Sequence, residues 1–158
     1  GGSDDLFAIT KKYKSGLILM HTPAVPKIMQ TKIHSYKNVI EDIRNIFKEK
    51  IKKIDAVKIP HKKVWFDPGI GFGKNLKQNL SIIKNIQKFK LLDFGLLVGL
   101  SRKSWISGID GSLVNKRLGG SLASALYCLN KGVDIFRVHD VFETKQAIEV
   151  YEKIICSR

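Results

Sequence analysis

Short apolar runs alternate with helical segments along this chain, and that alternation constrains the fold more than any other feature. The four runs cover residues 17–21, 64–69, 96–100 and 134–140. Elsewhere apolar residues recur every three or four positions, which predicts helices. The predicted helices cover residues 6–13, 36–54, 79–90, 121–131 and 142–155. Because near-continuous apolar strands that alternate with helices pair in parallel through right-handed crossovers, we predict an α/β fold with a parallel sheet.

Each apolar run leads into polar residues that can do chemistry. His21 ends the first run, Asp67 lies in the second, Lys103 follows the third, and Arg137 and His139 lie in the fourth. Parallel strands present their carboxyl ends at one edge, where α/β proteins and barrels build sites from the following loops. The 158 residues fit one doubly wound domain or half of an eightfold barrel, which needs about 250 residues.

Composition excludes several classes of protein. At 44% hydrophobic residues the chain can bury a core, and no run approaches the ~18 apolar residues of a membrane span. Neither a leader pattern nor metal-ligand spacing at Cys128 and Cys156 is present, so we expect a soluble, cytoplasmic protein. The net charge of +14 comes mainly from lysines scattered along the chain, a pattern that argues against a nucleic-acid partner.

A glycine-rich loop follows Asp67 and can approach a ligand closely. Residues 67–75 read DPGIGFGKN, one residue short of a Walker phosphate loop and without its Ser or Thr, while Lys74 replaces the last glycine of a dinucleotide motif. Two interpretations of Asp67 stay open. Its carboxylate could cap a tight turn, or its two oxygens could accept a bidentate pair of hydrogen bonds from a heterocycle with adjacent N–H groups.

Residues that follow the third run, and residues within the fourth, are suited to binding anions. Lys103 lies between Ser101 and Ser104, which could cap a helical turn whose free N–H groups attract an anion. Strand alternation places Arg137 and His139 on the same side of the fourth strand, as in a phosphate clamp. Taken singly, Lys103 could also be an ordinary surface lysine and His139 a structural histidine.

Five segments together resemble one enzyme family. They are LMHTPAVPKIMQ at 19–30, DPGIGFGKN at 67–75, LLVGLSRKS at 96–104, RLGGSLA at 117–123 and FRVHDVFET at 136–144. In this order, and over essentially the whole chain, they resemble the second half of dihydropteroate synthase. Ala24 departs from the family, which commonly has glycine there.

The resemblance implies a TIM (β/α)8 barrel of which this chain carries the second half, strands five to eight with their helices. It further implies an enzyme that condenses 6-hydroxymethyl-7,8-dihydropterin diphosphate with 4-aminobenzoate to give dihydropteroate and diphosphate, assisted by Mg²⁺. Residues 1–158 would then be the C-terminal part of a single pterin-binding barrel domain. The absent N-terminal half would supply the Mg²⁺ ligand, and no metal ligand is expected in this chain. Gly1 and Gly2 resemble the glycine pair after strand four, or a tag remnant.

The resemblance also assigns the residues that bind the pterin. Asp67 would bind its amino-pyrimidine edge, Lys103 would contact it, and Met20 would lie against it. Asp67, Lys103 and Arg137 would be the catalytic residues, in a dissociative displacement in which the diphosphate leaves before much bonding to the amine develops.

The resemblance implies that the remaining matching positions would bind the other substrate and the leaving group. Arg137 and His139 would bind the diphosphate, while Phe72, Lys103 and Ser104 would form the aminobenzoate site. We expect the chain alone to be inactive, to form a homodimer, or to pair with a separate N-terminal half. Two alternatives stay open: a pterin-binding, folate-dependent methyltransferase with the same barrel, and a non-catalytic half-barrel fragment.

Overall fold

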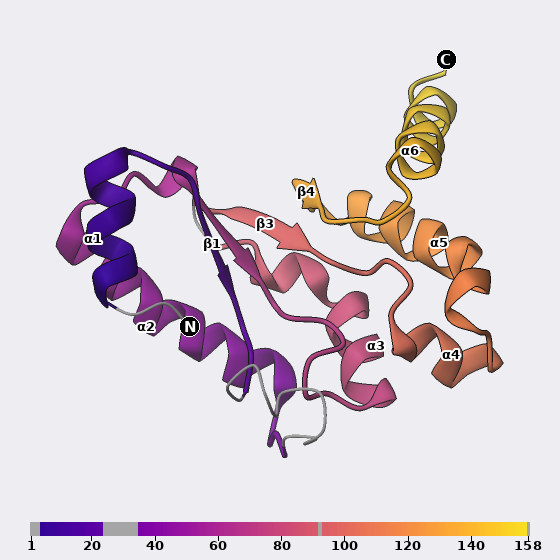
Figure 1. The fold of residues 1–158 in the computed structure, drawn as a ribbon, viewed down its shortest axis with the longest axis horizontal. Helices are drawn as coiled ribbons and strands as arrows, with labels where there is room; N and C mark the ends of the chain where they lie inside the picture. The colour runs from indigo at the N-terminus through magenta and orange to yellow at the C-terminus, as the bar shows by residue number, and fades with distance from the viewer. Residues whose placement is uncertain (1–3, 24–34, 92, 158) are drawn as a thin grey trace.

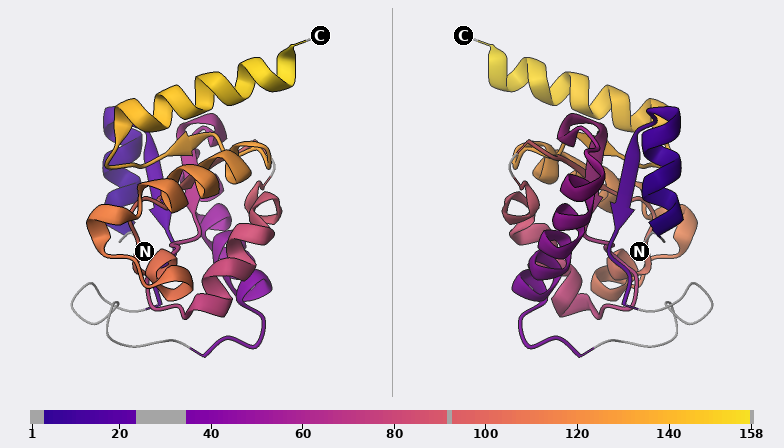
Figure 2. Two further views of the ribbon diagram at one scale, coloured as in Figure 1. Left: turned by 90° about the vertical axis from the view of Figure 1, so that its right-hand side faces the viewer. Right: turned by 90° about the vertical axis from the view of Figure 1, so that its left-hand side faces the viewer.

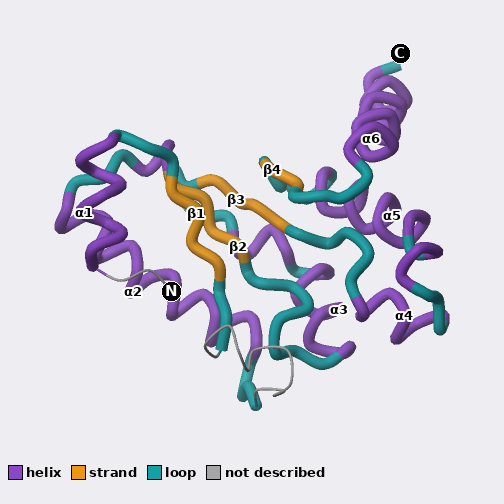
Figure 3. The backbone as a smooth tube through the Cα atoms, in the orientation of Figure 1, coloured by secondary structure: helices purple, strands orange, loops and turns teal. Residues whose placement is uncertain are grey.

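The apolar runs form a parallel sheet in the computed structural model, which describes residues 4–23, 35–91 and 93–157. Within these ranges the strands are β1 (Leu17–Met20), β2 (Val64–Asp67), β3 (Gly95–Val98) and β4 (Ile135–Phe136). The α-helices are α1 (Asp4–Tyr13), α2 (Val39–Val57), α3 (Leu76–Lys84), α4 (Ser104–Asp110), α5 (Leu118–Leu129) and α6 (Val141–Cys156). The strands lie in the order β1-β2-β3-β4 and all pair in parallel (Figures 1 and 3). The predicted α/β class is confirmed.

One face of the sheet forms the hydrophobic core with α2 and α3. Because side chains alternate along a strand, Leu19 and Phe66 share this face, and both are buried. The Phe66 ring centroid lies 4.6 Å from that of Phe47 on α2 and 5.2 Å from that of Phe94 before β3. Aromatic packing therefore fixes the helix layer against the middle of the sheet.

The opposite face of the sheet is much less covered. Ile18 of β1 points to this face and is 53% exposed. The Trp65 ring lies across Gly95, where an added Cβ would come within 2.0 Å of Trp65 Cδ1. Among the residues that the structure describes, β1 and β4 each pair on one side only, so the sheet that these residues form is open at both edges. Helix α6 packs on α5 and extends away from the rest of the chain (Figure 2).

Several elements begin or end away from their predicted positions. The helix predicted over 79–90 begins at Leu76 and ends at Lys84, and a 3-10 helix follows over Ile86–Phe89. The helix predicted over 121–131 begins at Leu118. The run over 134–140 contributes only Ile135–Phe136 as strand, although the Arg137 N–H still donates to the Val98 carbonyl at 2.9 Å.

The early start of α3 has a local cause. Asn75 caps the helix by accepting from the Gln78 N–H at 2.8 Å, and the Gln78 side chain accepts from the Asn75 N–H at 2.8 Å. This reciprocal capping box satisfies two helix N–H groups that would otherwise lack a partner. The cap therefore fixes where the glycine loop ends and the helix begins.

We expect Asn75→Ala to lower the free energy of unfolding by about 1 kcal/mol, because the alanine removes the acceptor of the capping box. Urea denaturation measures the change. Asn115→Ala, at an exposed position of a short 3-10 helix, is the matched control and should change stability by less than about 0.5 kcal/mol. Equal effects of the two substitutions would show that the cap contributes nothing.

Part of the resemblance lies outside the described residues: Gly1, Gly2, and the loop that contains Ala24. Among the helices that the structure describes, none combines the length and the apolar character needed to cross a membrane.

Candidate functional site

The parallel sheet brings three of the predicted site residues together at the carboxyl ends of its strands. Asp67 is the last residue of β2, Lys103 follows β3, and Arg137 follows β4. The positive charges of Lys103 and Arg137 both act on the Asp67 carboxylate. Met20, the last residue of β1, pairs in register with Asp67. The topology therefore assembles a small polar cluster around one acid.

The Asp67 carboxyl group is buried and almost completely shielded from solvent. Its side chain is 4% exposed, and Oδ1 accepts a hydrogen bond from the Gly69 N–H at 2.8 Å. Burial raises its pKa, while the Gly69 bond and the cations of Lys103, Arg137 and Lys74 oppose that rise. The contact with Gly69 leaves further lone pairs on both oxygens for a ligand.

Lys103 and Phe72 are in direct contact. The Lys103 Nζ lies 4.1 Å from the centroid of the Phe72 ring and donates a hydrogen bond to the Ile70 carbonyl. Gly71 allows this approach: its φ is +81°, and an added Cβ would lie 2.8 Å from Lys103 Cδ. The glycine loop after β2 therefore packs against the residue that follows β3.

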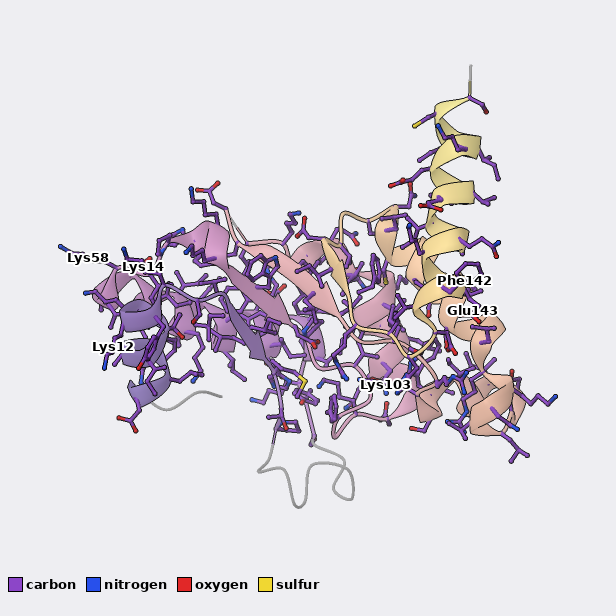
Figure 4. All side chains as sticks on the ribbon, turned by 45° about the horizontal axis from the view of Figure 1, so that its top comes forward. Lys12, Lys14, Lys58, Lys103, Phe142 and Glu143 are labelled. Atoms are coloured by element: carbon purple, nitrogen blue, oxygen red, sulfur yellow. The ribbon has the colours of Figure 1, made fainter. Side chains whose placement is uncertain are left out.

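Lys103 also differs from other lysines of the chain. Burial lowers its pKa to about 8, although the charge of Asp67 opposes the shift. Figure 4 shows Lys103 far from Lys12, Lys14 and Lys58, which lie together around α1 and the end of α2. The interpretation of Lys103 as an ordinary surface lysine is therefore wrong.

Arg137 and His139 lie at the carboxyl end of β4, and both are exposed. The Arg137 guanidinium passes over Gly99, where an added Cβ would lie 3.0 Å from Nη2. His139 Nδ1 is 2.9 Å from the Ser101 hydroxyl oxygen, which also accepts from the His139 N–H at 3.3 Å. The predicted alternation along one strand does not apply, because β4 ends at Phe136 and Ser101 sets the position of His139.

The predicted serine cap is wrong. Lys103 itself is the N-cap residue of α4, outside the helix, and its side chain makes no capping hydrogen bond. Ser101 is engaged with His139, and Ser104 is the exposed first residue of α4. The role of Ser104 toward a carboxylate stays a prediction.

An ion pair missed in the sequence connects the loops after β3 and β4. The Arg102 guanidinium donates to both oxygens of Asp140, through Nε at 2.9 Å and through Nη2. This bond lowers the pKa of Asp140. Arg102 adopts a φ of 54°, and its N–H and carbonyl are bonded to Ser121 Oγ and Arg117 Nη1. The sequence does contain one signal for this ion pair, because residues of opposite charge, Arg102 and Asp140, follow two strands that are neighbours in the sheet.

Two further residues hold the glycine loop and were not selected from the sequence: Lys74 within the loop and Asn79 on α3. Lys74 is 8% exposed, and its Nζ is bonded to the Gly69 and Phe72 carbonyls and to His21 Nδ1. Asn79 is buried; its Oδ1 accepts from the Gly71 N–H at 2.7 Å, and its Nδ2 donates to the Lys74 carbonyl at 3.1 Å. The loop is therefore held by one side chain of its own, Lys74, and by one side chain of α3, Asn79.

The buried cations predict a dependence of stability on pH. Burial lowers the pKa of Lys74 to about 7 and that of Lys103 to about 8, whereas both lysines stay protonated to higher pH in the unfolded chain. The unfolded state therefore binds more protons between pH 7 and 9. We expect the free energy of unfolding to rise over that window, by less than about 1.4 kcal/mol per pH unit for each lysine.

Urea denaturation at pH 7, 8 and 9 checks this expectation. Lys74→Met should have a shallower slope than the unmodified chain, because one of the two titrating groups is gone. Lys63→Met, which removes a lysine bonded to the Lys14 carbonyl far from the site, should keep the original slope. Parallel slopes for Lys74→Met and the unmodified chain would exclude Lys74 as a source of the effect.

The described residues offer no ready metal site. Within residues 4–23, 35–91 and 93–157, no three His, Cys, Asp or Glu side chains are grouped so that they could hold a metal ion. The cations beside Asp67 suit an anionic ligand instead, and its carboxylate suits a ligand with N–H donors.

Comparisons of the sequence and of the structure with known proteins both find dihydropteroate synthases. The chain is 39% identical over 140 residues to dihydropteroate synthase of Escherichia coli K12, covering 89% of this chain and 49% of that protein. The solved dihydropteroate synthase of Thermus thermophilus in complex with 4-aminobenzoate is 30% identical, with a TM-score of 0.88 over 97% of this chain and 62% of that one. The enzyme from Xanthomonas albilineans in complex with 7,8-dihydropteroate is 27% identical, with a TM-score of 0.87 over 99% of this chain and 56% of that one.

The chain spans about half the length of the curated relatives that it matches. The model of one family, described as pterin binding enzyme, matches residues 2–139. Since that match covers most of the sequence, the chain belongs to the pterin-binding enzyme family.

Proposed function

We propose that this chain carries the second half of a dihydropteroate synthase. The enzyme would condense 6-hydroxymethyl-7,8-dihydropterin diphosphate with 4-aminobenzoate to give dihydropteroate and diphosphate. The observation that carries the proposal is the buried Asp67 carboxylate, which has Lys103 and Arg137 close by at the ends of three parallel strands. Relatives that bind 4-aminobenzoate and 7,8-dihydropteroate support it.

We further propose that residues 1–158 are the C-terminal part of a single TIM-barrel domain, with β1 to β4 as barrel strands five to eight. The open edges at β1 and β4 support this arrangement, as does the exposed Ile18 on the face that a closed barrel would bury. The remaining strands would come from a separate N-terminal half or from a second copy of this chain. The Mg²⁺ ligand would belong to that N-terminal half.

In this proposal Asp67 binds the pterin. A carboxylate presents two oxygens in one plane, which matches the adjacent N–H donors of an amino-pyrimidine edge. Met20, paired in register with Asp67, would lie against the pterin ring, and Lys103 would contact the pterin from the neighbouring strand end. Phe72, Lys103 and Ser104 would form the aminobenzoate site, with Phe72 held beneath the Lys103 ammonium.

The leaving group would be bound on the other side of Asp67. Arg137 supplies a permanently charged guanidinium and His139 a neighbouring imidazole, and both are exposed and accessible to a diphosphate. As the bond from the methylene carbon to the diphosphate oxygen breaks, negative charge develops on the diphosphate and positive charge on the pterin methylene. Arg137 and Asp67 stabilise these two charges, and the amine then attacks the carbon and loses a proton.

The test is the intact mass of the purified material, with each polypeptide identified, followed by a dihydropteroate assay on the same sample. Activity together with a co-purifying N-terminal fragment, or activity of a dimer, supports the proposal. A single inactive 17.8 kDa species should gain activity when the N-terminal half of a relative is added. Persistent inactivity without pterin binding, or methyl transfer from a folate, would contradict it.

A further inference from the structure

The glycine loop wraps around the ammonium group of one lysine. Gly69, Gly71 and Gly73 have φ values of 68°, 81° and 59°, a region that favours glycine. The first of these cannot be replaced easily, because an added Cβ at Gly69 would lie 1.9 Å from the His21 carbonyl oxygen. Between these turns the carbonyls of Gly69 and Phe72 converge on Lys74 Nζ.

The protein surrounds the Lys74 ammonium with polar atoms. Its Nζ donates to the Gly69 carbonyl at 2.8 Å and to the Phe72 carbonyl at 3.1 Å, and it lies 3.2 Å from His21 Nδ1. The two carbonyls take two of the three donors of a protonated lysine, and His21 Nδ1 accepts the third in the tautomer that carries its proton on Nε2. Burying a cation is costly unless such bonds compensate, and burial lowers the pKa of Lys74 to about 7. The energetic cost of burying this lysine suggests that it has a specific role in the loop.

The segment that Lys74 holds carries both sides of the candidate site. At its start, the Gly69 N–H donates to Asp67 Oδ1. In its middle, the Ile70 carbonyl accepts from Lys103, and at its end Phe72 contacts the same lysine. The two carbonyls bound by Lys74 flank Ile70 and Gly71, so their separation sets where the Ile70 carbonyl and the Phe72 ring meet Lys103.

We propose that Lys74 is a positioning residue, which fixes the glycine loop so that Asp67 and the Lys103–Phe72 pair face the same ligand. It acts through the loop backbone and does not touch the ligand. Its ammonium replaces the water that would otherwise solvate two loop carbonyls, and the link to His21 ties the loop to the end of β1. This inference rests on the proposed function, since it takes the ligand to be a pterin with an aminobenzoate.

The test compares Lys74→Met with Lys63→Met, a control that removes a lysine bonded to a backbone carbonyl at the opposite end of the strands. Isothermal titration calorimetry with 6-hydroxymethyl-7,8-dihydropterin should give a Kd about fivefold or more higher for Lys74→Met and an unchanged Kd for Lys63→Met. Lys74→Gln, which keeps two N–H donors, should recover part of the affinity. A residue that only stabilises the fold would lower Tm and leave the Kd of the folded protein unchanged.

Hydrogen exchange gives a readout independent of the ligand. The Phe72 N–H, which donates to the Gly69 carbonyl, and the Gly69 N–H should exchange about tenfold faster in Lys74→Met. If the unmodified chain binds no pterin, the proposed function fails for this chain alone, and exchange of these two amides still decides the role of Lys74. Unchanged exchange with unchanged Kd would overturn the proposal. If Lys74→Met does not fold, Lys74→Gln is measured in its place against the same two criteria.

Discussion

Replacing Asp67 with asparagine should lower kcat/KM for dihydropteroate formation at least about tenfold, which corresponds to ~1.4 kcal/mol of lost transition-state stabilisation. Asparagine has the same shape and can still accept from the Gly69 N–H. It loses the negative charge that would face the developing pterin cation, and it presents an NH2 group where the ligand also has N–H donors. Steady-state kinetics on the active preparation measure the loss; where the chain alone is inactive, the Kd for the pterin replaces it.

The asparagine variant should still fold. The amide keeps the shape of the side chain and the bond to the Gly69 N–H, and it avoids the cost of burying a carboxylate, while Lys74 and Lys103 lose the negative charge that favours their protonated forms. Asp55→Asn is the matched control, because Asp55 pairs with His61 at the other end of the strands. Its kinetics should be unchanged. Near-original kcat/KM in Asp67→Asn would remove Asp67 from the proposed mechanism.

Phe66→Ala should lower the free energy of unfolding by about 3–5 kcal/mol. Phe66 is fully buried in β2, and its ring packs between Phe47 and Phe94, so alanine leaves a cavity bounded by two aromatic rings. Domains are typically stable by only ~5–15 kcal/mol, so this single change removes a large share of the total. Urea denaturation followed by circular dichroism measures it.

Phe142→Ala provides the comparison for the same change of residue type. Phe142 lies at the start of α6 (Figure 4), where its side chain is 73% exposed, and its loss should change stability by less than about 0.5 kcal/mol. A cost below about 1 kcal/mol for Phe66→Ala would mean that the helices close over the vacated space, and that this aromatic cluster does not hold them to the sheet.

The alternation of strands and helices along the chain could be predicted because it depends on hydrophobic period, which each segment carries by itself, and the alternation in turn predicts parallel pairing. The ends of the elements could not. The start of α3 depends on reciprocal bonds between Asn75 and Gln78, and the end of β4 depends on where its pairing with β3 stops. Such bonds involve one or two atoms and leave little trace in a pattern of apolar residues.

Some residues of the candidate site could likewise be predicted from the sequence, and others could not. Asp67, Lys103 and Arg137 were predicted together because parallel strands bring their carboxyl ends to one edge. Lys74 was missed because a buried lysine looks like any other in a chain with 28 basic residues. The pair of Arg102 and Asp140 was missed because its partners are 38 positions apart, and only the packed structure shows that their loops touch.

The bonds that shape the glycine loop are mostly of short range. Asp67 bonds to Gly69 two positions on, Asn75 to Gln78 three positions on, and Gly71 to Asn79 eight positions on. Closing such small loops costs little chain entropy, so this wall of the site can form early in folding. The contact of Arg102 with Asp140 must wait until β3 and β4 have paired. We therefore expect the two sides of the candidate site to form at different stages in the folding of the chain.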